Sequence, residues 1–427
     1  MTEAARAASQ LYRPKLATTF AEGYGLADLR KDAVAGLTVA IVALPLSMAI
    51  AIASGVSPDK GLYTAIVGGF LVSALGGSRF QIGGPAGAFI VLVAATVAKF
   101  GVEGLALTVL MSGAMLALMG AFRLGNLIRH IPHTVTVGFT AGIAVTIAAS
   151  QLKDLFGLRL AGKEPGAFIP KMAALAKAAP TANLETFALA AAVIAIILAV
   201  RRWKPMWPAM LIAVAAASVA GVMLRLPVET IGTRFGGIPH GLPAPKLPPL
   251  DASLAIALLP AALSFTLLGA IESLLSAVVA DGMTGRRHRS NMELIAQGLA
   301  NMASAVFGGI SVTGTIARTA TNVRAGGRSP VAGMLHAAFL LVFMMVAAPL
   351  ASYIPVSALA GVLMLVAWNM AEKGEFAMLL RDWRTAAVLM ATFGLTVVRD
   401  LTTGIVAGCL LATAFWALHR ARKTHAA

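Results

Sequence analysis

Two ionisable side chains lie inside strongly apolar stretches, where a charge is unusual. Glu272 stands in the apolar run 267–276, and Ser276 follows four residues later, so on a helix the carboxyl and the hydroxyl share one face. Arg318 lies inside the short predicted span 315–323. A charge at membrane depth costs roughly 2.5–3.5 kcal/mol on insertion scales, so such residues usually have a function. We interpret Glu272 and Ser276 as a site for a proton or small cation, and Arg318 as an anion ligand.

Structural roles are the alternatives for the same residues. A protonated Glu272 could hydrogen-bond to a neighbouring helix, and Arg318 could form an ion pair with Glu272. The readings can coexist, because an ion pair formed without substrate could give way to an anion.

Two glycine-rich breaks are the second chemical signal. The stretches GGPAGA (83–88) and GGISVTGT (308–315) interrupt apolar sequence, and each precedes a run too short to span a bilayer. Glycine and proline at this density stop a helix, which leaves free N–H groups at the start of the next one. Each half-helix N-terminus carries about +0.5 charge. Paired breaks in two halves of a chain point to the substrate site of an inverted-repeat transporter, here one for an anion.

The elements that must position these groups are membrane helices. Of the 427 residues, 58% are hydrophobic and 12% are charged, about half the charged fraction of a soluble domain. Apolar runs of bilayer-spanning length recur along the chain. We predict an all-α integral membrane protein with fourteen segments, some short or broken: 33–53, 61–77, 86–99, 104–122, 133–151, 183–200, 206–224, 252–280, 293–308, 315–323, 330–350, 356–371, 385–398 and 401–418.

The basic residues indicate the orientation. With both termini in the cytoplasm, most Lys and Arg clusters fall on the cytoplasmic side, for example Arg201 and Arg202, and the run Arg286, Arg287 and Arg289. We therefore expect a multi-pass protein of the inner (plasma) membrane. The net charge of +16 then reflects contact with anionic lipid headgroups and not nucleic-acid binding.

The chain divides into two halves of seven spans. We predict a cytoplasmic N-terminal segment (1–29), a first repeat (30–225), a Pro-rich extracellular connection (226–250), a second repeat (251–418) and a cytoplasmic tail (419–427). An odd number of spans per half makes the second repeat enter the membrane from the opposite side. The stretches 79–82 and 310–313 before the half-helices are β-prone.

The sequence resembles the SulP (sulfate permease) anion transporter family. The matching stretches extend from about Leu29 to Leu418 and are specific in combination. They are DAVAGLT (32–38), GVSP (55–58) with GLY (61–63), GGP (83–85), AIESLL (270–275) and VTGTIARTATN (312–322) with GGR (326–328).

The resemblance implies a uracil-permease-like fold of seven plus seven spans. Spans 1–4 and 8–11 would form a core domain, spans 5–7 and 12–14 a gate domain, and the core would slide like an elevator, usually within a homodimer. Carried over by position, the predicted substrate contacts are Leu46, Ile50, Ala86, Gly87, Thr315, Ala317 and Arg318. The cation position falls on Glu272 and Ser276. Relatives that use sodium carry Asp where Glu272 stands, so Glu favours protons.

Two features depart from the family pattern. Many relatives have Gln where Leu46 stands, which removes one expected hydrogen bond to the anion. Most also carry a STAS domain after the last span, whereas this sequence ends nine residues after Leu418. We therefore expect the membrane domain alone.

We predict a proton-coupled symporter of a small anion of the dicarboxylate, bicarbonate or sulfate class. Protons, or alternatively sodium ions, are the coupling ion, and no resident cofactor or metal is expected. The alternatives are a nucleobase:proton symporter of the same fold and an uncoupled anion exchanger or channel. An intramembrane enzyme is not expected, because the sequence shows no paired nucleophile and base and no metal cluster at depth.

Overall fold

A computed structural model describes residues 12–424 apart from 127–131, 163, 206 and 400. The first eleven residues of the predicted N-terminal segment and the last three of the predicted tail lie outside it. The helices are α2 (Lys15–Ala21), α3 (Leu26–Ala53), α4 (Pro58–Tyr63), α5 (Gly69–Leu75), α6 (Ile90–Ala121), α7 (His133–Phe156), α8 (Phe168–Ala178), α9 (Leu184–Trp203), α10 (Ala209–Met223), α11 (Ile231–Phe235), α12 (Ala252–Thr284), α13 (Ser290–Val306), α14 (Ile316–Arg324), α15 (Pro330–Ala351), α16 (Val356–Met370), α17 (Lys373–Leu379), α18 (Trp383–Val398) and α19 (Leu401–Thr424). The strands are β1 (Gly83–Gly84) and β2 (Thr313–Gly314).

Eight of the described helices are long and apolar enough to cross a membrane. Each of the fourteen predicted segments coincides with a helical segment, but several of these are shorter or interrupted. The third and fourth predicted segments form the single helix α6, which kinks at Gly101 (φ 72°, ψ −175°). This kink lies in the gap between the two predicted segments, between residues 99 and 104. The second segment consists of α4 and α5 joined by a π-helical turn at Thr64–Gly68.

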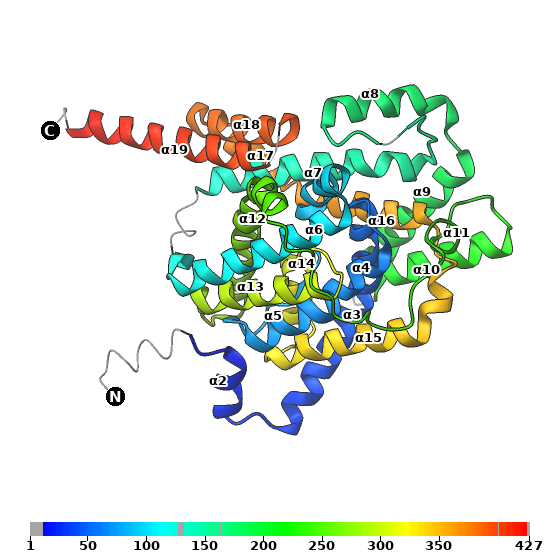
Figure 1. The fold of residues 1–427 in the computed structure, drawn as a ribbon, viewed down its shortest axis with the longest axis horizontal. Helices are drawn as coiled ribbons and strands as arrows, with labels where there is room; N and C mark the ends of the chain where they lie inside the picture. Colours follow the sequence, from blue (N-terminus) through cyan, green and yellow to red (C-terminus); the bar gives the residue numbers. More distant parts are fainter. Residues whose placement is uncertain (1–11, 127–131, 163, 206, 400, 425–427) are drawn as a thin grey trace.

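The helices pack mainly within two groups. Helix α6 packs against α12 and α13, and α15 packs against α3 and α5. In the other group, α7 packs against α16 and α18, and α9 packs against α10 and α16. Helix α3 also contacts α10 and α16, so it lies where the groups meet. In Figure 1, α2 and the end of α19 lie on the left, and α8 and α11 lie on the right.

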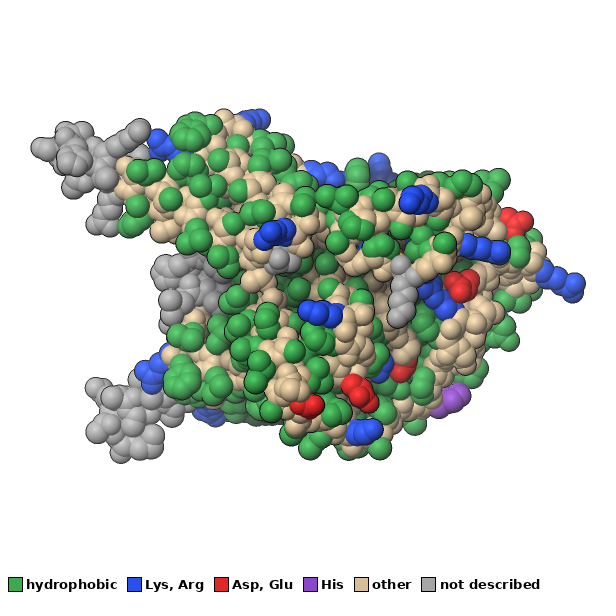
Figure 2. All heavy atoms as spheres, turned by 45° about the horizontal axis from the view of Figure 1, so that its top comes forward, with side chains coloured by type: hydrophobic (Ala, Val, Ile, Leu, Met, Phe, Trp, Pro, Cys, Tyr) green, Lys and Arg blue, Asp and Glu red, His purple; other side chains and the backbone are tan. Residues whose placement is uncertain are grey.

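The surface is apolar, as a lipid-facing protein requires. Figure 2 shows hydrophobic side chains spread over the whole of the face in view. Large apolar side chains such as Ile256, Val346 and Leu410 are more than 60% exposed. These residues lie on three separate long helices, α12, α15 and α19, so the exposed apolar surface is not one confined patch.

Candidate functional site

The two glycine-rich breaks meet in the structure. Strands β1 and β2 pair antiparallel, with Gly83 opposite Gly314 and Gly84 opposite Thr313. Beyond β1 the chain turns through a 3₁₀ turn (Gly87–Phe89) into α6, and beyond β2 it enters α14 directly. Because the strands are antiparallel, the two helices leave the pair in opposite directions. Their N-termini therefore start on either side of one short ladder.

The strands are shorter than the predicted β-prone stretches and lie closer to the helices. Residues 79–82 and 310–312 are not in strands, and several of their backbone groups bond to side chains, although the carbonyl of Ile82 accepts from the N–H of Thr315 at 3.2 Å. The N–H of Ile82 donates to Oγ1 of Thr319 at 3.2 Å. Asn301 accepts from the N–H of Val312 at 3.0 Å and donates to its carbonyl at 2.7 Å. These bonds satisfy buried backbone groups that lie outside the two-residue ladder.

Arg318 lies next to this ladder and is 2% exposed. Its Nη2 donates to Oγ of Ser47 on α3 at 3.0 Å, and that hydroxyl donates to the carbonyl of Ala43 at 2.7 Å. Its Nε and Nη1 have no hydrogen-bond partner among the described residues. A buried guanidinium with two unused donors is suited to bind an oxyanion through charge-assisted hydrogen bonds.

The alternative of an ion pair between Arg318 and Glu272 is wrong. No ion pair joins them in the part of the chain that the structure describes, and Ser47 takes the guanidinium instead. Glu272 is 9% exposed, in the middle of α12. Ser276 is fully buried one turn later, and its hydroxyl is 3.0 Å from that of Thr319 on α14. This bond links the helix that carries Glu272 to the helix that carries Arg318.

The other predicted contacts lie on α3 and on the chain segments that follow the two strands. Leu46 and Ile50 are buried on α3, next to Ser47, and Ala86 is buried between β1 and α6. Gly87 begins the 3₁₀ turn and Thr315 is the N-cap of α14, both partly buried. Ala317 is exposed on the first turn of α14. Sequence reasoning missed Ser47, the direct partner of Arg318, because a serine on an apolar helix face usually bonds only to its own helix.

Asp32 is a second residue whose role the sequence did not reveal. It is fully buried near the start of α3 and accepts from the N–H of Arg328 at 2.7 Å and from the hydroxyl of Tyr24 at 2.9 Å. It also accepts from the hydroxyl of Ser329, the N-cap of α15. Asp32 therefore ties α3 to the turn that follows α14. An acidic residue at the start of an apolar run was the available signal.

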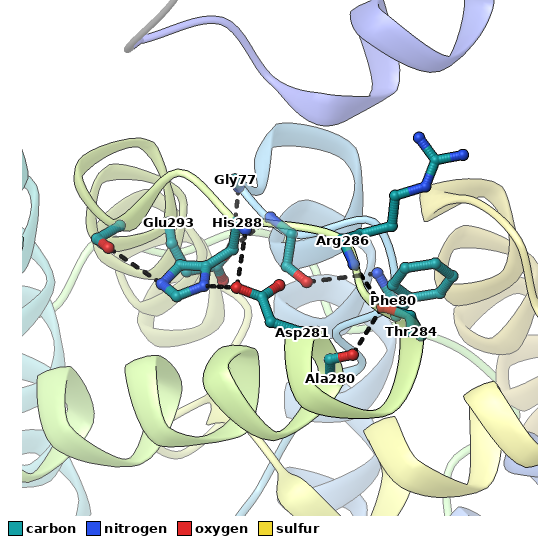
Figure 3. Close-up of polar contacts among 10 residues, drawn as sticks. Gly77, Phe80, Ala280, Asp281, Thr284, Arg286, His288 and Glu293 are labelled. Carbon is teal, nitrogen blue, oxygen red and sulfur yellow. Dashed lines mark hydrogen bonds and ion pairs between the residues drawn. The ribbon is translucent and has the colours of Figure 1, made fainter.

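The turn between α12 and α13 holds a further polar network (Figure 3). Asp281 accepts from the N–H of His288 at 3.0 Å and lies 2.7 Å from its Nδ1, while Oγ of Ser290 lies 3.0 Å from its Nε2. A cavity of about 460 Å³ lies beside it, lined in part by Arg286 and Arg287. The order Ser–His–Asp is that of a hydrolase triad. Ser290 is only 6% exposed, however, so we assign the network to fixing the turn.

Glu293 fixes the same end of α13 to the segment before β1. It is fully buried and accepts from the N–H groups of Gly77 and Ser78 at 2.8 and 3.0 Å. Figure 3 shows its side chain beside Gly77. Through these bonds α13 supports the approach to β1, as Asn301 supports β2.

This fold and site define a class of protein: a helical membrane protein built around two paired, interrupted segments. The sulfate permease family model matches residues 29–392. Putative sulfate transporter YvdB of Bacillus subtilis is 44% identical over 397 residues, which is 92% of this chain and 75% of that protein. Bicarbonate transporter BicA of Picosynechococcus is 32% identical over 90% of this chain and 69% of that protein.

Solved structures have the same fold. The transmembrane domain of a cyanobacterial bicarbonate transporter BicA superposes with a TM-score of 0.81 at 31% identity, over 90% of this chain and 98% of that one. SLC26A9 superposes with a TM-score of 0.87 at 19% identity, over 98% of this chain and 70% of that one. The chain belongs to the sulfate permease family.

Proposed function

We propose that this protein is a secondary active transporter of small anions. The observation that carries the proposal is the buried guanidinium of Arg318, with two unused donors, beside the paired starts of α6 and α14. Unpaired donors buried at membrane depth are costly, and a bound oxyanion would satisfy them. The substrate class is dicarboxylate, bicarbonate or sulfate. The names of the relatives YvdB and BicA support sulfate and bicarbonate.

Glu272 is the proposed coupling residue. Its carboxyl group has no hydrogen bond or ion pair to any residue that the structure describes, so it is available to a proton or a sodium ion. The bond between Ser276 and Thr319 connects α12 to α14. Binding of a cation at Glu272 can therefore alter the position of α14. Protonation of Glu272 would remove a negative charge from the anion's surroundings, which favours binding of both together.

Movement and assembly are part of the same proposal. Fourteen spans in two inverted repeats, an elevator-like displacement of a core against a gate, and a homodimer follow from the resemblance. Packing within two helix groups supports such a displacement. We place both termini in the cytoplasm and the protein in the inner membrane, on the distribution of its basic residues.

Flux in proteoliposomes tests the proposal. Uptake of labelled sulfate, bicarbonate and C4-dicarboxylates is measured with and without an inward proton gradient. Proton-driven accumulation of one of them is the expected result. Uptake of uracil but of no anion would favour a nucleobase symporter, and electrical currents far above carrier turnover would favour a channel.

A further inference from the structure

A small cavity lies among the end of α3, the first turns of α6, the C-terminal half of α7, the start of α8 and the end of α18. It measures about 40 Å³, enough for about three waters at 10–15 Å³ each. One wall carries Ala53, the last residue of α3, and Ile90, the first residue of α6. Ile90 lies three residues after the predicted anion contact Gly87, so the cavity borders the first turn of the half-helix that follows the predicted site.

The remaining residues that line the cavity include polar and positively charged side chains. Thr146 and Ser150 of α7 line the cavity, but their hydroxyls donate to carbonyls of their own helix at 2.8 and 2.7 Å. Their hydrogens are therefore not available to an anion. The cavity also contacts Lys171 of α8 and Arg399, which caps the C-terminus of α18. These two cations, from two separate elements, are the groups able to attract an anion here.

Lys171 already has a carboxylate partner. Its Nζ lies 2.9 Å from Oε1 of Glu164, and the two side chains are 13% and 26% exposed. An ion pair in contact with water exchanges readily with other ions. The Glu164 carboxylate therefore binds the Lys171 ammonium group in the way that an incoming anion would.

We propose that Lys171 and Arg399 form a recruitment site for the transported anion at the α8 mouth, with Glu164 as its built-in competitor. The inference rests on the proposed anion transport. An anion arriving on this side replaces Glu164 at Lys171 and then passes between α3 and α7 toward Arg318. Anions arriving from the opposite side do not use the site.

Lys171→Met tests this, with Lys177→Met as the matched control. Lys177 lies on the same helix but is exposed and does not line the cavity. Initial uptake rates are measured in vesicles of both orientations. Lys171→Met should raise KM from the α8 side about threefold or more, with the largest effect at low ionic strength. Arg399→Gln should act in the same direction, and Glu164→Gln should lower that KM. KM from the other side should not change.

A binding measurement separates this inference from the proposed function. Acylation of Lys171 and Lys177 by an amine-reactive reagent is followed by mass spectrometry over a range of sulfate concentrations. Sulfate should protect Lys171 but not Lys177, and protection should need less sulfate in Glu164→Gln. Protection without any anion flux would support the site while refuting transport. Equal protection of both lysines by sulfate, no protection of Lys171, or a KM change of equal size on both sides would overturn the inference.

Discussion

Gly84 lies directly against Arg318. A Cβ atom built on Gly84 would collide with Nη1 of the Arg318 guanidinium. The glycine is therefore required at this position for space, because its φ is not in the left-handed region. The same arrangement holds across the ladder, where a Cβ on Gly314 would collide with Nε2 of Gln81. Each strand thus leaves room for a buried polar side chain.

Gly84→Ala should displace Arg318 and weaken anion binding. The added methyl group forces either the guanidinium or the β1 backbone to move, so both substrate affinity and Tm should fall. Gly241→Ala is the control, since its Cβ would meet nothing within 4 Å. Isothermal titration with the transported anion and thermal unfolding measure the two effects. Unchanged affinity in the Gly84→Ala variant would show that the contact has no role in binding.

Arg318→Ala should weaken anion affinity about 10- to 100-fold. Hydrogen bonds to a charged group contribute about 1.5–3 kcal/mol, and each 1.4 kcal/mol is tenfold in Kd. Arg318→Lys keeps the charge but loses the planar fork, so its affinity should fall between those of wild type and Arg318→Ala. Arg324→Ala, on the exposed last turn of α14, is the matched control. Equal affinities in all four proteins would leave the helix N-termini as the only attractor.

Glu272→Gln should abolish uphill uptake driven by a proton gradient. The amide keeps the shape of the side chain but takes up no proton in the working pH range, so anion exchange should continue without accumulation. Glu103→Gln, exposed beside the kink of α6, serves as the control. Counterflow and gradient-driven uptake in proteoliposomes separate the two activities. Full accumulation by the Glu272→Gln variant would refute the coupling role.

Acid should weaken the attachment of the N-terminal helix α2. Glu22, next to α2, forms an ion pair with Arg79, and the hydrogen bond from Arg79 lowers the pKa of Glu22 below its usual 4.5. A depressed acid pKa contributes stability above pH 4.5, and this contribution is lost as pH falls through the folded-state pKa. The Tm difference between wild type and Glu22→Gln should therefore be present at pH 7 and shrink below pH 4.5. A difference that does not change with pH would contradict this role.

The helical segments and their interruptions could be predicted from local sequence. Apolar length predicted the long helices, and the glycine-rich breaks and Gly101 lie where the backbone departs from a helix. The partner of Arg318 could not be predicted in this way, because Ser47 lies 271 residues away along the chain. Intramembrane charge suggested Glu272 as the partner, yet the packing of α3 against α14 decided otherwise.

The observed strands overlap the predicted β-prone stretches only at Thr313, for a related reason. Residues 79–82 and 310–313 have the composition of strands, but Asn301 and Thr319 take up the backbone groups next to the short ladder. Side chains from α13 and α14 thus bond to the backbone beside the ladder, and no local pattern in the β-prone stretches predicts these partners.

Selenate, a heavy analogue of sulfate, gives the most direct test of the central claim that the paired half-helices and Arg318 bind the anion. Crystals of the protein are soaked in selenate, and anomalous diffraction locates selenium. We expect a peak between the start of α6 at Ala86 and Gly87 and the start of α14 at Thr315 to Arg318, and its loss in Arg318→Ala. A saturating peak elsewhere in the membrane region, with none at this ladder, would contradict it.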